Sequence, residues 1–438
     1  MTEALASSPA RAGAVPKPSD VRVAAERRLK KRYAAEQRFK WLGRFAIIMA
    51  LSFLAILLTR IIGQGYTAFW THNVTAQVRI DPARVDRAYL EGTNFDQMIA
   101  EAVLVRLGGR DDPEGLASGE VRRLLSPDLG LNLLARVREN PELIGRTVTI
   151  SGAVSDDADL FYKDKIDRTQ PEAERTVDDA QIRLLDRLES EGLVEPGFNT
   201  ALFTRTDSTQ PEIAGVLGAV VGSLMTILVA AGLAVPIGVL AALYLEEFAP
   251  RNRLTQFIEV NINNLAAVPS IVYGLLGVAV ILNVFGLPRA SPLAGGMVLS
   301  LMAMPTVIIA TRSALKAVPP SIREAALGVG ASRSQTVFHH VLPLAMPGVL
   351  TGAILALAKA LGETAPLLLI GMVAFTPSIP SGPTDSATVL PVQIFLWNNA
   401  SERGFEERTA AAILVLLLFM ICMNALAITL RRRFERRW

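Results

Sequence analysis

A lysine and a glutamate stand four residues apart in a segment that is otherwise almost wholly apolar. Lys359 and Glu363 belong to the run ALAKALGETAP, inside a stretch from about 349 to 373 with the composition of a membrane span. An ionised residue at the centre of a span costs about 2.5–3.5 kcal/mol, so such residues normally face a protein interior or a watery path. Positions i and i+4 of a helix share a face, which lets the two side chains pair. The segment predicts either a charged substrate path or an ion pair that fixes helix packing.

Three neighbours add to the chemistry of this segment. Thr364 supplies a hydroxyl next to the glutamate, and Gly362 allows a partner helix or a substrate to approach the backbone. Pro366 lacks an N–H and therefore frees a carbonyl in the turn before it. We expect Lys359, Glu363 and Thr364 to line the path.

The composition indicates a polytopic helical membrane protein. Of 438 residues, 51% are hydrophobic and 19% are charged, which is unusually apolar for a soluble chain of this length. Long apolar segments predict about six transmembrane helices. They cover about 41–70, 214–244, 260–286, 295–312, 347–375 and 409–430. Proline interrupts several of them, as is common in transporters.

The loops indicate the orientation of these helices. Basic residues are concentrated in both terminal segments and in the stretches around Arg251 and Arg312, whereas the other short loops hold few. By the positive-inside rule, both termini are expected in the cytoplasm of a multi-pass inner-membrane protein. The formal net charge of +3 does not argue for nucleic acid. Cys422 is the sole cysteine, so a metal site built on cysteines is not expected.

These patterns divide the chain into four parts. We expect a cytoplasmic basic segment over 1–40, a first transmembrane helix over 41–70, an extracytoplasmic domain over 71–210 and a transmembrane domain over 211–438. The 71–210 domain should be mixed but mainly helical.

Three short runs in this domain suggest local structure. The runs VTAQVRI and GRTVTISGAV alternate in the manner of strands. The run SDDADLFYKDKID faintly resembles a calcium loop, but it lacks the central glycine and the closing glutamate. We interpret it as a solvated acidic loop.

The loop over 316–343 has a more specific pattern. Two prolines at 319–320 can begin a helix, IREAALGVG can form one, and glycines at 328 and 330 can end it before a second amphipathic stretch. Such a helix–glycine–helix unit is a docking shape. A surface-lying amphipathic connector is the alternative, and periodicity does not separate the two.

Several of these residues resemble a known family. The run Glu324-Ala325-Ala326, followed by Gly330 and by Leu342-Pro343, resembles the EAA loop of ABC importer permeases. The runs LAKALGETAPLLLIGMV, VPIGVLAALYLEEF and AAVPSIVYGLLG are similar to the PstA permeases of phosphate ABC importers. The resemblance covers about 213–435 and the first apolar segment, and the 71–210 domain is an insertion relative to it.

The resemblance implies a type I ABC importer permease fold and a role in moving inorganic phosphate. It implies that Glu324, Ala325, Ala326, Gly330, Leu342 and Pro343 couple the permease to a cytoplasmic ATPase. Its implied partners, besides membrane lipid, are a PstC-like permease, a PstB-like ATPase dimer and an external PstS-like phosphate-binding protein. The chain has no G-x-x-x-x-G-K-[ST] run, so no cofactor is expected in it, and ATP and Mg²⁺ belong on the ATPase. The chain is then a transmembrane subunit and not itself an enzyme. Where Lys359 stands, the family usually has arginine, which binds oxyanions in a two-pronged fashion that lysine lacks.

Three other functions remain open at this point. In the first, the chain imports a different oxyanion, such as sulfate or molybdate. In the second, the chain is an ion-coupled secondary transporter whose charged pair relays protons, although such a carrier has no ATPase to dock. In the third, it is a membrane sensor with 71–210 as its ligand domain.

Overall fold

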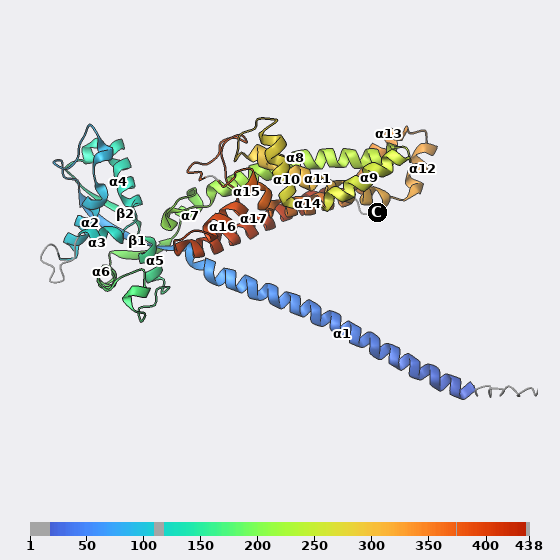
Figure 1. Cartoon of the computed structure of the whole chain (residues 1–438), viewed down its shortest axis with the longest axis horizontal. Helices are drawn as coiled ribbons and strands as arrows, with labels where there is room; N and C mark the ends of the chain where they lie inside the picture. The colour runs from blue at the N-terminus through green and yellow to red at the C-terminus, as the bar shows by residue number, and fades with distance from the viewer. Residues whose placement is uncertain (1–17, 109–117, 374, 435–438) are drawn as a thin grey trace, which may run out of the picture. The chain divides into compact units, whose positions relative to one another are not determined.

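The computed structural model describes residues 18–108, 118–373 and 375–434 (Figure 1). The chain falls into two compact units, residues 1–60 and residues 61–438. The first 17 residues of the predicted 1–40 segment and the last four residues of the basic tail lie outside the described part. Helix α1 (Pro18–Gly65) runs without a break from the basic segment through the first apolar segment. Its stretch from Arg28 onward is long and apolar enough to cross a membrane.

A small mixed domain follows α1, and we call residues 70–204 the sheet domain. Its antiparallel sheet has the order β2-β1-β3, with β1 at Trp70–Arg79, β2 at Thr147–Ala153 and β3 at Val194–Phe198. In its described residues the sheet is accompanied by the helices α2 (Phe95–Arg106), α3 (Ser118–Arg123), α4 (Asp128–Glu139), α5 (Asp156–Tyr162) and α6 (Asp179–Ser190). A short helix, α7 (Ala201–Thr204), ends the domain.

The strands show what the sequence pattern did and did not reveal. The two alternating runs are β1 and β2, as predicted, and Val74, Ala76 and Val78 of β1 are all buried in the domain core. Strand β3 was not predicted, because its run VEPGF contains proline and glycine, which are depleted in strands. Among the described residues it pairs with β1 alone and is an edge strand, where proline is tolerated.

The acidic run SDDADLFYKDKID is not a solvated loop, so that interpretation was wrong. Its first half forms α5, in which Ala158, Asp159, Leu160 and Phe161 are buried. Acidic residues in a first helical turn are favoured by the helix dipole, and the apolar residues between them give the helix a core-facing side. An acidic composition therefore concealed a buried helix.

Five helices are long and apolar enough to cross a membrane, and a bent pair raises the number of spans to six within the described residues. Besides α1 they contain α8 (Leu217–Leu243), α11 (Pro292–Lys316), α14 (Leu342–Leu361) and α17 (Gly404–Phe434). The bent pair joins α9 (Arg253–Ala266) to α10 (Ser270–Leu276) and the π-helical turn at Gly277–Leu282, at an angle of 105°. Proline at 269 stands at the bend. This mostly helical polytopic architecture confirms the predicted fold class.

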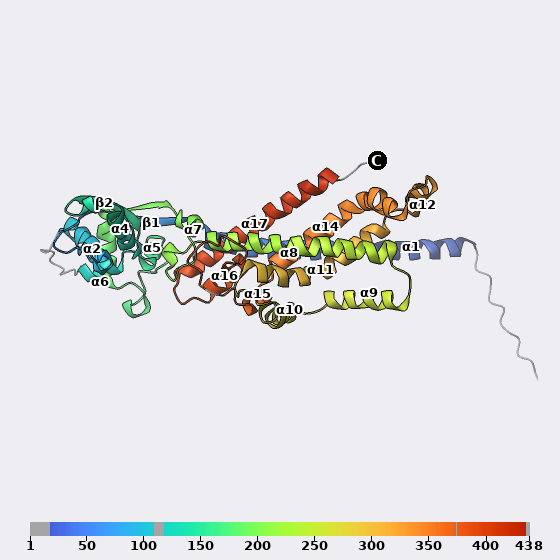
Figure 2. The same ribbon diagram turned by 90° about the horizontal axis from the view of Figure 1, so that it is seen from above.

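Helices α8, α11 and α14 pack together along the length of the bundle (Figure 2). Small residues allow this approach. A side chain at Gly238 would meet Val307, and one at Gly352 would meet Ala310. Close packing through small residues is the usual basis of helix association in membranes. The candidate site residues lie at the two ends of α14, which this packing holds in place.

Candidate functional site

Lys359 lies in the last turn of α14, on the exposed side of the helix. Its neighbours Ala356 and Ala360 are buried in the bundle core, whereas Leu355, one turn earlier, is 64% exposed. The lysine therefore shares a stripe with an exposed leucine on the side of α14 that this chain does not cover. The last carbonyls of a helix carry partial negative charge, which favours a cation at this position.

The helix does not continue to Glu363, so the predicted i,i+4 relation is wrong. Helix α14 ends at Leu361. After it the chain makes tight turns, in which the amide of Gly362 donates to the carbonyl of Lys359 and that of Glu363 to the carbonyl of Ala360, each at 3.2 Å. In the part of the chain that the structure describes, no ion pair joins Lys359 to Glu363. The physical reason is Pro366, which lacks an N–H and whose ring clashes with the carbonyl four residues earlier, so one continuous helix through this position is disfavoured.

The segment after the break packs against the bundle core and against α10. Helix α15 (Ala365–Leu369) carries Leu367 into the bundle core, together with Ile370 just beyond it. A side chain at Gly274 of α10 would stand 2.8 Å from the Cα atom of Pro366, so the two helices are in close contact there. Glu363 and Thr364 are half-buried in the connection between α14 and α15. The break thus places Lys359, Glu363 and Thr364 along one short section of chain, with Lys359 facing outward.

The predicted helix–glycine–helix unit is present at the other end of α14. Helix α12 (Pro320–Gly328) begins at the second proline, and α13 (Arg333–Gln335) leads through a π-helical turn at Thr336–Val341 into α14. Glu324 and Ala325 are exposed on α12, whereas Ala326 is 6% exposed and packs inward. Leu342 and Pro343 are half-buried in the first turn of α14.

Gly330 ends α12 because its backbone has a positive φ of 89°. The amide of Ala331 donates to the carbonyl of Ala326, and the amide of Gly330 donates to that of Leu327, each at 3.0 Å. This is the Schellman arrangement, which satisfies the last carbonyls of a helix and favours glycine. The glycine therefore fixes where the exposed face of α12 stops.

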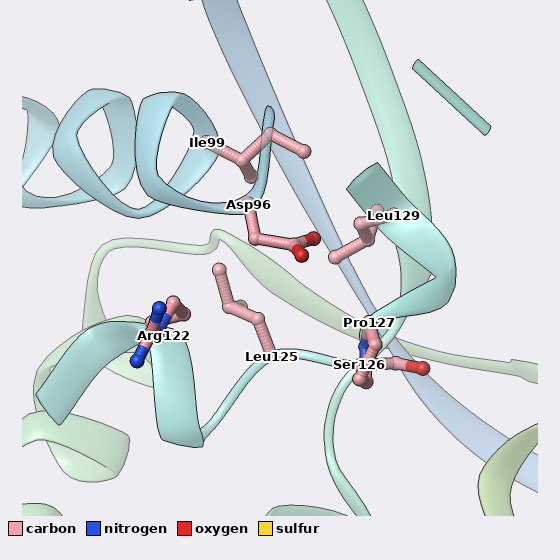
Figure 3. A pocket seen from close by; sticks show the side chains of 7 residues that line it. All are labelled: Asp96, Ile99, Arg122, Leu125, Ser126, Pro127 and Leu129. Atoms are coloured by element: carbon pink, nitrogen blue, oxygen red, sulfur yellow. The ribbon is translucent and has the colours of Figure 1, made fainter. Parts of the chain in front are cut away.

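The sheet domain holds a small cavity of about 250 Å³ (Figure 3). Asp96 and Arg122 supply its charged groups, and Ile99, Leu125 and Leu129 supply most of its apolar wall. Burial raises the pKa of Asp96, although a hydrogen bond from the Gly130 amide and the charge of Arg122 oppose the shift. This cavity is far in sequence from every predicted site residue.

A buried ionic cluster, which the sequence analysis did not predict, lies where the sheet domain meets α17. Lys163 donates to Glu407 Oε1 at 2.7 Å and pairs with Asp159 at 2.5 Å, and all three side chains are at most 6% exposed. Lys165 and Thr67 donate to Glu407 Oε2 at 2.7 and 2.8 Å. We call Thr67, His72, Asp159, Lys163, Lys165 and Glu407 the junction cluster. Its lysines and its glutamate lie more than 240 residues apart in the chain, as the 242-residue separation of Lys165 and Glu407 illustrates.

Hydrogen bonding decides the ionisation of Asp159 in this cluster. Burial favours the neutral carboxyl, but hydrogen bonds from His72 and the charge of Lys163 outweigh it and lower the pKa of Asp159. The Nδ1 atom and the backbone amide of His72 both lie 2.9 Å from the same carboxylate oxygen.

Asp156, next to the cluster, behaves in the opposite way. Burial raises the pKa of Asp156 to about 7, even though the Gly404 amide donates to its carboxylate at 3.0 Å. Glu212, Asp157 and Glu407 add to the rise by charge repulsion. Gly404 is the first residue of α17, so this carboxyl touches the start of that helix.

Two family models match the chain. One, described as a binding-protein-dependent transport system inner membrane component, covers residues 234–438, and the other, a domain of unknown function named DUF3333, covers residues 26–172. The phosphate transport system permease protein PstA of Haemophilus influenzae is 31% identical over 52% of this chain and 80% of its own length. The protein of the same name from Yersinia pestis is 32% identical over 53% of this chain and 77% of its own length. The chain belongs to the PstA family.

Membership of the PstA family makes this chain a multi-pass inner-membrane permease of an ABC importer, and such permeases work with an ATPase and a substrate-binding protein. The inward-facing MetNI methionine ABC transporter is 18% identical over 50% of this chain and 96% of its own, with a TM-score of 0.42. The 235–248 and 266–277 runs that carried the resemblance form the end of α8 and the α9–α10 bend.

Proposed function

We propose that this chain is the PstA-type permease subunit that moves inorganic phosphate through an ATP-driven importer. The observation that carries the proposal is its likeness to PstA permeases over about four fifths of their length. Its natural partners are then a PstC-like permease, a PstB-like ATPase dimer that binds ATP and Mg²⁺, and an external PstS-like phosphate-binding protein. The chain itself needs no cofactor for this role.

The proposed topology has both termini in the cytoplasm. Six spans, counting the bent α9–α10 pair as one, return the chain to its starting side. The basic residues around Arg251 and Arg312 then face the cytoplasm with α12, as the positive-inside rule favours. The four predicted parts stand in this proposal, with the sheet domain outside the membrane.

The substrate path is proposed to run along the side of α14 that carries Lys359, Glu363 and Thr364. A cation in a span needs protein or water around it, and Lys359 faces away from the core of its own chain. A second permease facing this side of α14 would enclose the lysine in a hydrated path, where it attracts an anion. The Thr364 hydroxyl follows shortly after the break at Leu361.

The coupling surface is proposed to be the exposed face of α12. Glu324 and Ala325 point outward from it, while Ala326, Gly330, Leu342 and Pro343 shape and anchor the loop. ATP-driven closure of the ATPases would move α12, and the bundle would then switch the side to which the path opens.

Uptake by the reconstituted importer tests this function. We expect phosphate uptake to require the ATPase and ATP, and Lys359→Ala to reduce it by at least about tenfold while the complex still assembles. Lys359→Arg, which keeps the charge, is the matched control and should retain uptake. Uptake driven by an ion gradient alone would instead indicate a secondary transporter, and faster uptake of sulfate or molybdate would replace the proposed solute. Wild-type uptake by Lys359→Ala would remove the lysine from the path.

A further inference from the structure

One arginine joins three elements behind the exposed face of α12. Arg323 donates from Nε and Nη2 to Glu247 Oε1 at 3.2 and 2.6 Å. Glu247 belongs to the π-helical turn at Tyr244–Phe248, which ends α8. The same guanidinium donates to the carbonyl of Leu315 in α11 at 3.0 Å and to that of Val318, in the turn before α12, at 2.8 Å.

This contact is sheltered from water. The Glu247 side chain is 9% exposed and that of Arg323 is 24% exposed. Pairs of this kind are costly to break, because removal of one partner leaves the other without its counter-charge. Lysine cannot replace the arginine here, since an ammonium has no planar fork with which to reach a carboxylate and two carbonyls at once.

The two neighbours Arg323 and Glu324 point in opposite directions. Glu324 is exposed on α12, whereas Arg323 reaches back into the bundle. Apolar packing on that inner side is modest: Ala326 is buried and Ile322 is only partly buried against the cluster around Leu315 and Val318. The arginine therefore supplies the main directional contact between α12 and the ends of α8 and α11.

A second ionic contact lies at the same end of the bundle but does not involve α12. Arg312 of α11 pairs with Glu246 at 3.3 Å and with Glu259 of α9 at 2.8 Å, and its side chain is 15% exposed. It joins α11 to α8 and α9 through groups of the same chemistry. This provides an internal control for the role of Arg323.

We infer that Arg323 is a positioning residue that transmits the displacement of α12 to α8 through Glu247 and to α11 through the Leu315 carbonyl. The inference rests on the proposed docking of an ATPase to α12 and assigns to this arginine a role separate from docking. Without the contact, α12 moves with the ATPase while the bundle lags behind, so ATP is hydrolysed without a matching opening of the path.

The test compares phosphate uptake with ATP hydrolysis in the complete reconstituted importer. For Arg323→Lys we expect the ATPase to stay bound and active while phosphate moved per ATP falls about tenfold. Arg312→Lys should keep that ratio within about twofold of wild type even where it lowers thermal stability. Glu324→Ala should instead weaken retention of the ATPase, because its side chain faces outward.

The possible outcomes distinguish the proposed function from the role assigned to Arg323. A wild-type complex without ATP-dependent phosphate uptake would refute the proposed function itself. A wild-type ratio in Arg323→Lys, or loss of the bound ATPase from that variant, would overturn the inference alone. If the Arg323→Lys chain fails to fold, Glu247→Gln decides: it keeps an oxygen acceptor but loses the charge. We expect the ratio to fall about threefold in that variant, and an unchanged ratio counts against the inference.

Discussion

At the scale of single residues, two ionisable groups of this chain lie in contrasting environments. Lys359 lies in the last turn of α14, close to the partial negative charge of the helix's last carbonyl groups. Asp156 lies in a buried site among other carboxylates, and its pKa is raised to about 7. The first group is suited to attract an anion, whereas the second changes its charge within the ordinary range of pH.

The raised pKa of Asp156 predicts that the protein is more stable when this carboxyl is protonated. Between the ordinary value and about 7, the folded chain holds a proton that the unfolded chain has released, so stability falls as pH rises through this range. Asp156→Asn imitates the neutral form and still accepts the hydrogen bond from Gly404. We expect its midpoint of thermal unfolding to exceed that of wild type, with a larger difference at pH 8 than at pH 5.

The control is Asp159→Asn in the neighbouring cluster. The pKa of Asp159 is lowered, so its ionised form stabilises the fold at both pH values. Its substitution should destabilise the protein at pH 5 and at pH 8 alike. If the difference in unfolding midpoint between Asp156→Asn and wild type were the same at pH 5 and at pH 8, the raised pKa of Asp156 would be contradicted.

At the scale of elements, the two glycines at the C-terminal end of α12 differ in backbone conformation. Gly330 has a φ of 89°, whereas Gly328 lies within the helix, and neither would bring an added Cβ within 4 Å of a neighbour. We expect Gly330→Ala to destabilise the loop by about 1 kcal/mol, because alanine resists left-handed backbone. Gly328→Ala should be neutral or stabilise α12 by up to about 1 kcal/mol. Protease cleavage of the 316–343 loop measures both, and equal cleavage of the two variants would exclude the proposed helix end.

Elements were predictable where one local pattern fixed them. Apolar length located α8, α11 and α17, and two prolines followed by glycines located α12. The end of α14 at Leu361 was missed because the i,i+4 spacing of two charges suggested a continuous helix. The proline at 366 carried the correct signal. Strand β3 depends on pairing with β1, which no local pattern records.

At the scale of the whole molecule, the sheet domain and α17 are joined by the junction cluster. Lys163 is 6% exposed and lies between Asp159 and Glu407. Lys163→Met should leave both carboxylates without their main cation at a cost of about 3–5 kcal/mol. We expect it to release the sheet domain for limited proteolysis. Lys165→Met is the matched control, because that lysine is 32% exposed and contacts the same glutamate, so its effect should be smaller.

A second variant tests whether the pairing itself matters. Combining Lys163→Met with Glu407→Gln removes a charge from both sides and should restore part of the resistance to protease. If Lys163→Met and Lys165→Met were equally resistant, the cluster would not hold the domain. Sequence alone gave no access to this contact, since its charges come from distant segments whose folds had to be known first.

The separation of Lys163 and Glu407 by 244 residues has a consequence for biosynthesis. At about 5–20 residues per second, the ribosome needs roughly 10–50 s to make the glutamate after the lysine. During that interval the newly synthesised sheet domain carries the Lys163 ammonium without its counter-ion on α17. Its final compaction therefore waits for the last membrane helix, and a nascent chain released before that helix would present an unfinished domain to the cell's proteases.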